Sequence, residues 1–222
     1  MKRELKRPFL VGVTGGIGSG KSTVCHFLAE MGCALFEADR VAKELQCSDP
    51  QIIAGIRKLF GNDVYFSASG ASLQLDRRRV ASEVFSNPEK LRALNHLVHP
   101  AVHEAFRAAV EAARQQGREV LVKEAAILFE TGRTADLDLI VVVVADTQLR
   151  LRRAVEKGLG SREEVLGRMA FQWPQEKLLE KAGYVIHNEG SEDDLRRQTE
   201  ILYEFILQEA ASGRDCSGKS GQ

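Results

Sequence analysis

One segment near the start of the chain constrains its fold more than any other. Residues 9–14 form a largely apolar run typical of a buried strand, and residues 15–22 match the pattern G-x-x-x-x-G-K-[ST] at every position. Residues 24–31 then form an apolar, helix-forming segment. Strand, glycine-rich loop and helix in this order predict a phosphate-binding loop, because glycines let backbone N–H groups face a phosphate and the helix N-terminus adds positive charge.

The polar residues of this motif have predicted roles. In such loops the lysine, here Lys21, reaches the β- and γ-phosphates of the nucleotide, and the next hydroxyl, Ser22, ligates Mg²⁺. The predicted ATP-binding residues of the loop are Gly16, Ile17, Gly18, Ser19, Gly20, Lys21, Ser22 and Thr23. An incidental glycine-rich turn would not be expected to have this strand and this helix on its two sides.

The composition is that of an ordinary globular protein of 222 residues. Lys plus Arg and Asp plus Glu number 31 each, and zero net charge argues against a dedicated nucleic-acid binder. No apolar run has the length of a membrane span, and a signal cleavage near the first strand would destroy the loop. We therefore expect a cytoplasmic protein without a membrane partner, either monomeric or weakly homo-oligomeric.

The cysteines do not predict a metal or redox site. The four of them, Cys25, Cys33, Cys47 and Cys216, lack C-x-x-C spacing. We interpret Cys25 and Cys33 as small apolar packing residues around the first helix.

Apolar runs alternate with amphipathic helical stretches along the chain, which predicts an α/β fold with a mostly parallel sheet and helices on both faces. Together with the phosphate-binding loop, this architecture resembles that of the P-loop nucleoside-monophosphate kinases. The predicted strands are at about 9–14, 33–37, 119–123, 138–145 and 184–187. The run 139–144 is apolar on both faces, as expected of a central parallel strand.

We expect one P-loop kinase domain over residues 1–205, interrupted by a helical insertion and a lid. The insertion is too long for a simple crossover, so we assign it substrate binding, and the lid stretch is charged and contains glycines. The final residues are small and polar, which predicts a disordered tail. The predicted core covers about residues 9–45 and 118–205, and the insertion covers about 46–117. The predicted lid covers about 157–172 and the tail 206–222.

Several classes of nucleotide-binding protein share such a loop. A GTPase would need a guanine-reading N-K-x-D motif, which the sequence lacks. Asp146 follows the valine-rich strand as a magnesium-holding carboxylate would, but it also matches a helix N-cap, the interpretation that we favour. A small-molecule kinase remains, and such an enzyme needs a carboxylate near the acceptor hydroxyl and positive charge in its lid.

Asp39 is the candidate carboxylate. It directly follows the second predicted strand, at the end of the sheet where ligands bind in open α/β folds. There it could accept a proton from the acceptor hydroxyl. The alternative is that Asp39 caps a helix over residues 40–45.

Several further segments, in this order and spacing, resemble the dephospho-coenzyme A kinases from about residue 9 to 205. The first loop is similar to that family's opening, and Glu37-Ala38-Asp39 stands where the family has D-A-D. The other matching segments are Leu75-Asp76-Arg77, Val84-Phe85, Leu94-Asn95-His96-Leu97-Val98-His99-Pro100, Ala126-Ile127-Leu128-Phe129-Glu130, Arg168-Met169-Ala170-Phe171-Gln172 and Val185-Ile186-His187-Asn188.

The resemblance implies ATP- and Mg²⁺-dependent phosphorylation of the ribose 3′-hydroxyl of dephospho-coenzyme A, the last step of coenzyme A synthesis. It implies Asp39 as catalytic base, with Lys21 holding the phosphates. It assigns the remaining site residues as follows: His99 and Glu130 to the substrate, Lys157 and Arg168 to the phosphates, and Asn188 to the adenine. The alternatives are a kinase of another small hydroxyl or nucleotide substrate, and a nucleotide-binding regulatory module with weak catalysis.

Four segments, with five residues among them, depart from the family pattern. Lys157-Gly158 stands where the family has an Arg-Asp lid pair, and lysine keeps the charge but loses the two-pronged guanidinium. The others are Glu37 for the first aspartate of D-A-D, Ala126 for a proline and Gly183 for an aspartate before the last strand.

Three histidines offer a different kind of site. His96, His99 and His103 recur at spacings that could line one helical face and hold a metal. Pro100 is expected to break that helix, and no cysteine or carboxylate completes a tetrahedral set. We therefore expect His99 and Pro100 to form a turn of the substrate-binding insertion.

Overall fold

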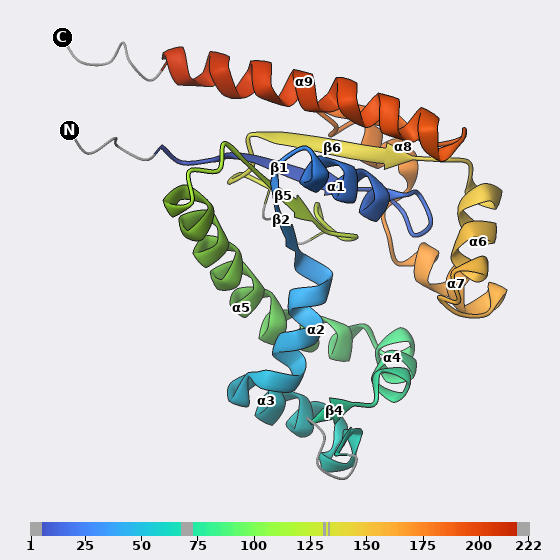
Figure 1. Cartoon of the computed structure of the whole chain (residues 1–222). Helices are drawn as coiled ribbons and strands as arrows, with labels where there is room; N and C mark the ends of the chain where they lie inside the picture. The colour runs from blue at the N-terminus through green and yellow to red at the C-terminus, as the bar shows by residue number, and fades with distance from the viewer. Residues whose placement is uncertain (1–5, 68–72, 131, 133, 217–222) are drawn as a thin grey trace. The chain divides into compact units, whose positions relative to one another are not determined.

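The chain divides into two compact units, and each is described by itself. Figure 1 shows the computed structural model, which describes residues 6–67, 73–130, 132 and 134–216. One unit consists of Met1–Glu37 with Val110–Gln222, and the other is Ala38–Ala109. The predicted insertion started at about residue 46, whereas the second unit begins at Ala38.

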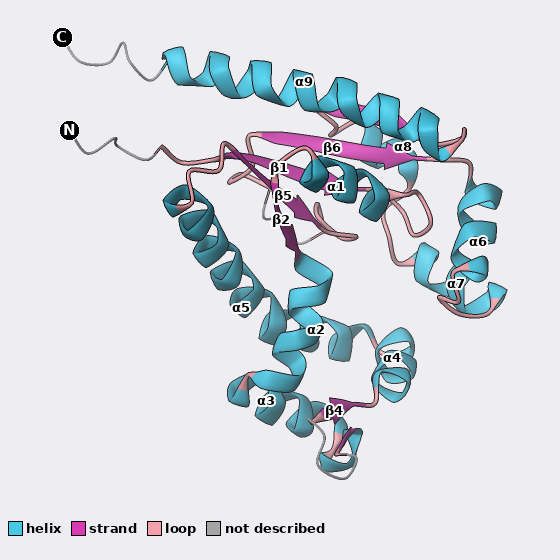
Figure 2. Cartoon of the chain, viewed as in Figure 1, coloured by secondary structure: helices cyan, strands magenta, loops and turns pink. Residues whose placement is uncertain are grey.

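The first unit is built on a five-stranded sheet whose order is β2-β5-β1-β6-β7 and whose neighbouring strands are all parallel (Figure 2). The strands are β1 (Phe9–Thr14), β2 (Ala34–Glu37), β5 (Val120–Glu124), β6 (Leu139–Val144) and β7 (Tyr184–His187). The predicted parallel sheet is therefore confirmed, and β6 pairs on both sides as its apolar sequence predicts.

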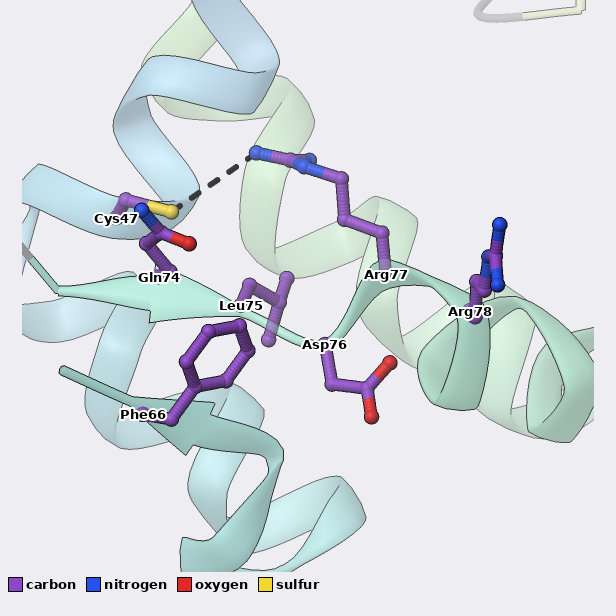
Figure 3. A pocket seen from close by; sticks show the side chains of 7 residues that line it. All are labelled: Cys47, Phe66, Gln74, Leu75, Asp76, Arg77 and Arg78. Carbon is purple, nitrogen blue, oxygen red and sulfur yellow. Dashed lines mark hydrogen bonds between the residues drawn. The ribbon is translucent and has the colours of Figure 1, made fainter. Parts of the chain in front are cut away.

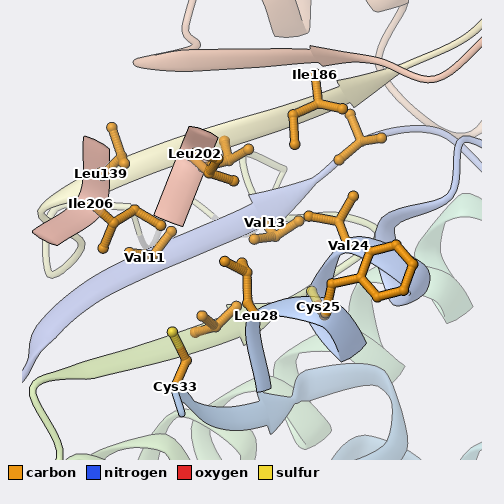
Figure 4. Packing of buried hydrophobic residues seen from close by; sticks show 14 of the residues in the cluster. Val11, Val13, Val24, Cys25, Leu28, Cys33, Leu139, Ile186, Leu202 and Ile206 are labelled. Carbon is orange, nitrogen blue, oxygen red and sulfur yellow. The ribbon is translucent and has the colours of Figure 1, made fainter. Parts of the chain in front are cut away.

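Helices cover both faces of this sheet. On one face α1 (Lys21–Glu30) and α9 (Glu192–Cys216) enclose the main core, in which Val11 and Val13 of β1 are fully buried (Figure 4). On the other face α8 (Gln175–Leu179) packs Leu178 against β6. The doubly covered sheet agrees with the predicted fold class.

The two predicted packing cysteines lie in the main core. Cys25 and Cys33 are 0% and 7% exposed. Burial raises the pKa of the Cys33 thiol to about 12 and raises that of Cys25 well above its usual value. Both side chains therefore behave as small apolar groups, as the sequence predicted.

The prediction of a disordered tail over 206–222 is wrong for residues 206–216, which continue α9. Leu202, Ile206 and Ala210 recur every four residues, and all three are buried. Their burial holds this part of the helix against the sheet despite the small polar residues that follow. Residues 217–222 lie outside the described part of the chain.

The second unit is mainly helical. Its elements are α2 (Ala38–Ser48), α3 (Pro50–Phe60), the 3₁₀ turn η1 (Asn62–Val64), β3 (Tyr65–Phe66), β4 (Gln74–Leu75), α4 (Arg77–Ser86) and most of α5 (Pro88–Gln115). Its core gathers buried side chains such as Ile56, Val64 and Val98. Ala42 and Leu45 of α2 pack on that core, and this explains why the unit starts earlier than predicted.

The predicted turn at His99 and Pro100 is wrong, because both residues lie inside α5. A proline in a helix removes one backbone hydrogen bond and costs about 3 kcal/mol. Burial of apolar side chains on both sides of it, Val98 and Phe106 among them, offsets that cost.

No helix among the described residues is long and apolar enough to cross a membrane.

The C-terminal half of α9 should contribute directly to stability. Ile206→Ala removes a side chain that is 0% exposed, so the free energy of unfolding should fall by about 2–5 kcal/mol. Ile201→Ala on the same helix removes a side chain that is 60% exposed and should change stability little. Urea unfolding followed by circular dichroism measures both. Equal effects of the two substitutions would contradict the assignment of this segment to the core.

Candidate active site

The phosphate-binding loop has the backbone that its glycines predict. The chain leaves β1 at Thr14, and α1 starts at Lys21 after Gly20. Gly15, Gly18 and Gly20 have φ angles of 148°, 77° and 99°. Residues with a Cβ rarely adopt these angles, so the glycines allow the loop to curve tightly before the helix. Strand, loop and helix N-terminus together form a site for an anion.

Lys21 lies over this loop. Its side chain is 8% exposed, and Nζ donates a hydrogen bond to the carbonyl of Gly16 at 3.1 Å. The ammonium is thus held beside the loop before any nucleotide binds. A positive charge fixed in this way needs little rearrangement to meet the negative charge of a phosphate.

A carboxylate faces the loop hydroxyl. Ser22 Oγ donates a hydrogen bond to Glu124 Oε1 at 2.6 Å. Glu124 is the last residue of β5, and β5 pairs with β1 so that Val13 stands opposite Glu124. The parallel register therefore brings a carboxylate to the edge of the sheet from which the loop emerges.

Asp146, the alternative carboxylate, has a structural role. Its side chain accepts hydrogen bonds from the backbone N–H groups of Gln148 and Leu149, at 2.8 and 3.0 Å. It is the N-cap of α6 (Thr147–Glu156). The predicted N-cap is confirmed, and the carboxylate beside the loop is Glu124.

Two side chains hold the peptide groups of Ile17. Arg150 of α6 donates from Nε to the Ile17 carbonyl at 3.1 Å, and Gln172 accepts from the Ile17 N–H at 2.8 Å. Gln172 also donates to the carbonyl of Ala126 at 2.9 Å, so it links the loop to the segment after β5. Arg150 is 8% exposed, and burial lowers the pKa of its guanidinium.

A third side chain holds the loop from the end of β7. Asn188 donates from Nδ2 to the carbonyl of Ser19 at 2.8 Å and is 6% exposed. Its own carbonyl accepts from Arg153 at 2.8 Å. Asn188 packs so closely on Gly20 that a Cβ there would overlap its amide. Sequence reasoning placed Asn188 at the adenine, and the structure adds a contact with the loop backbone.

The predicted lid starts at the C-cap of α6 and contains all of α7 (Arg162–Ala170). Lys157 is exposed at the C-cap of α6, and Gly158 follows with a φ of 69°. Arg168 donates from Nη1 to the carbonyl of Leu159 at 2.9 Å. Arg168 therefore braces the turn between α6 and α7, while Lys157 presents its charge to solvent.

The segment after the lid is tied to the segment after β5. Glu130 accepts a hydrogen bond from the backbone N–H of Trp173 at 3.0 Å. The Trp173 ring stacks on Phe129, with centroids 5.6 Å apart, and the Lys177 ammonium lies 3.5 Å from its centroid. Glu130 was predicted to bind substrate, and the structure gives it this contact within the first unit.

The other two predicted substrate-side residues belong to the second unit. Asp39 is exposed in the first turn of α2, which starts at Ala38. The alternative of an N-cap for a helix starting at residue 40 is wrong, since Asp39 lies inside the helix. His99 is half-buried in the middle of α5.

Within the described residues, no group of three or more His, Cys, Asp or Glu side chains could hold a metal ion.

A cavity of about 610 Å³ opens in the second unit (Figure 3). It is lined by Cys47, Phe66, Gln74, Leu75, Asp76, Arg77 and Arg78. Arg77 donates to Gln46 Oε1 at 2.8 Å and to the Lys43 carbonyl at 3.0 Å, so it joins α4 to α2. Asp76 caps α4 by accepting from the Arg79 N–H at 3.0 Å.

Comparison with known proteins decides the family. The family model for dephospho-CoA kinase matches residues 9–194, which include the loop, Glu124 and Asn188. The chain belongs to the dephospho-CoA kinase family. A dephospho-CoA kinase of Chlorobium luteolum is 56% identical, over 96% of this chain and 97% of that protein. One from Chlorobaculum tepidum is 60% identical, over 90% of this chain and 96% of that protein.

A solved structure shares the fold of this chain. The crystal structure of a Thermus thermophilus protein is similar with a TM-score of 0.73 and 35% sequence identity, and covers 90% of this chain and 98% of that one. The α/β fold predicted from the sequence is thereby confirmed.

Three site residues of this dephospho-CoA kinase were not assigned from the sequence. Glu124 could have been found, because it follows a buried strand at the ligand-binding edge of the sheet. Gln172 stands in a segment that resembles the family but was given no role, and it bonds the loop backbone from 155 residues away. Arg150 could not have been found, since it bonds the loop backbone over a separation of 133 residues. No local pattern marks a side chain that pairs with a distant peptide group.

Proposed function

We propose that the loop, Ser22 and Glu124 form the ATP–Mg²⁺ half of the active site in this kinase. Membership of the family gives the reaction, phosphorylation of dephospho-CoA at the expense of ATP in the final step of coenzyme A synthesis. The observation that carries the proposal is the 2.6 Å hydrogen bond between Ser22 and Glu124 at the start of α1. It supports a place for the metal beside the helix terminus that would hold the phosphates.

The residues present fit Mg²⁺. This ion prefers oxygen ligands and is commonly bound through one or two carboxylates together with the substrate's phosphates. Ser22 offers a hydroxyl and Glu124 a carboxylate. When bound, Mg²⁺ neutralises charge on the β- and γ-phosphates. Lys21 adds a second fixed positive charge for the same phosphates, because its ammonium already lies over the loop.

Loss of the Glu124 charge should weaken magnesium binding. Glu124→Gln keeps an oxygen that can accept from Ser22 but removes the negative charge. The Mg²⁺ concentration for half-maximal turnover should rise by about 10- to 100-fold. Turnover is titrated with Mg²⁺ at saturating ATP, with Glu192→Gln in the exposed first turn of α9 as the control. An unchanged Mg²⁺ requirement would exclude Glu124 from the metal site.

On the acceptor side, we assign Asp39 as the base that takes the proton from the ribose 3′-hydroxyl. Its position two residues after the end of β2, with Glu37 before it, matches the D-A-D element of the family. His99 and Glu130 are assigned to dephospho-CoA. In the lid, Lys157 and Arg168 are assigned to the triphosphate, with Asn188 near the adenine as well as on the loop.

The role of Asp39 is separable from a role in helix stability. Asp39→Asn should lower kcat by about 10²- to 10⁴-fold and leave the Kd for ATP unchanged, because a base acts on the transferred proton alone. The control is Glu44→Gln on the same helix, which removes an exposed ion pair with Arg40. If Asp39 only complements the helix dipole, turnover stays near wild type and unfolding is easier by about 0.3–1 kcal/mol.

One assay separates this function from its two alternatives. We expect ADP release from ATP to depend on dephospho-CoA and to be negligible with nucleosides or sugars as acceptors. Turnover on another acceptor alone would indicate a different small-molecule kinase. Calorimetric binding of ATP without turnover on any acceptor would indicate a nucleotide-binding regulatory module.

A further inference from the structure

Gly16 differs from the other glycines of the loop, because its φ angle does not explain why the residue is glycine. Gly15, Gly18 and Gly20 adopt positive φ angles, whereas Gly16 does not. The sign of φ at position 16 therefore does not call for glycine. Something other than conformation excludes a side chain there.

The neighbour that excludes it is Arg150. A Cβ built on Gly16 would overlap the guanidinium, and its three nearest atoms are Nη2, Cζ and Nε of that side chain. The guanidinium cannot move away at no cost, because it is buried and Nε is bonded to the Ile17 carbonyl at 3.1 Å. Gly16 and Arg150 are therefore matched to each other across 134 positions of sequence.

We propose that Arg150 is a positioning residue for the phosphate-binding loop, and that Gly16 is glycine because Arg150 occupies the space of its side chain. By holding the Ile17 carbonyl away from the phosphates, Arg150 keeps the inner N–H groups of the loop turned toward the nucleotide. Gly18 also lies close to Arg150, since a Cβ built on Gly18 would be 2.1 Å from the backbone carbonyl oxygen of Arg150. The proposal rests on the assignment of this loop to ATP.

A double-mutant cycle tests the pairing, with the Kd for ATP measured by calorimetry. Gly16→Ala should raise the Kd by about 10- to 100-fold through steric overlap. Arg150→Ala should raise it by about three- to tenfold through the lost hydrogen bond. The double variant should bind about as well as Arg150→Ala alone, because the space is then free. If the Kd of the double variant instead exceeds that of wild type by the product of the two single fold-increases, the two residues act independently and the proposal is overturned.

Gly18→Ala is the matched control for the cycle. Its Cβ would meet the backbone of Arg150, not the side chain, and its φ is 77°. Arg150→Ala should therefore give no rescue of Gly18→Ala. Arg152→Ala, an exposed neighbour on α6 paired only with Glu156 at 3.9 Å among the described residues, should leave the Kd unchanged. Rescue of Gly18→Ala to the same degree as Gly16→Ala would show a general loosening and would overturn the proposal.

Two further measurements separate positioning from charge and from folding. Arg150→Gln removes the positive charge but keeps a side-chain N–H donor, so it should bind ATP better than Arg150→Ala. A Gln variant that binds ATP no better than Arg150→Ala would show that the charge, and not the hydrogen bond, matters and would overturn the proposal. Hydrogen exchange without nucleotide should be faster at residues 16–20 in Arg150→Ala and unchanged in β6. If wild-type protein itself fails to bind ATP, the function assigned to the loop fails instead.

Discussion

A loop that turns its N–H groups toward a phosphate must turn its carbonyls toward the protein, and each buried carbonyl then needs a donor. In this kinase side chains supply those donors. Arg150 donates to Ile17 and Asn188 to Ser19. The phosphate-binding surface therefore exists before the nucleotide arrives, because its outer side is already bonded. Pre-organisation of this kind lowers the cost of ordering groups on binding.

The sheet order determines where those donors come from. β6 lies next to β1 and β7 lies next to β6, so the segments that follow β6 and β7 start close to the loop that follows β1. Arg150 is carried by the helix after β6, and Asn188 directly follows β7. On the other side of β1, β5 brings Glu124 to Ser22. The loop is thus surrounded by the ends of three neighbouring parallel strands, which is the general location of ligand sites in such folds.

The sequence predicted the parts of this protein that local chemistry specifies. The five strands, the loop and the Asp146 cap follow from apolar runs, glycine spacing and capping chemistry within a few residues. The failures have tertiary causes. Pro100 stays inside α5 because buried neighbours offset a missing hydrogen bond, and residues 206–216 stay helical because Ile206 and Ala210 reach the core. The links from Arg150 and Gln172 to Ile17 join residues that only the folded sheet brings together.

Trp173 is the only tryptophan in the sequence. Its backbone is bonded to Glu130, its ring is stacked on Phe129, and the residue before it is the one that bonds the Ile17 N–H. Its ultraviolet emission therefore comes from one place, the junction between the lid and the loop. Any closure of the lid that shifts this stack, or moves the Lys177 ammonium off the ring, changes that emission. The single tryptophan thus provides an intrinsic optical signal for changes at this junction, without an added dye.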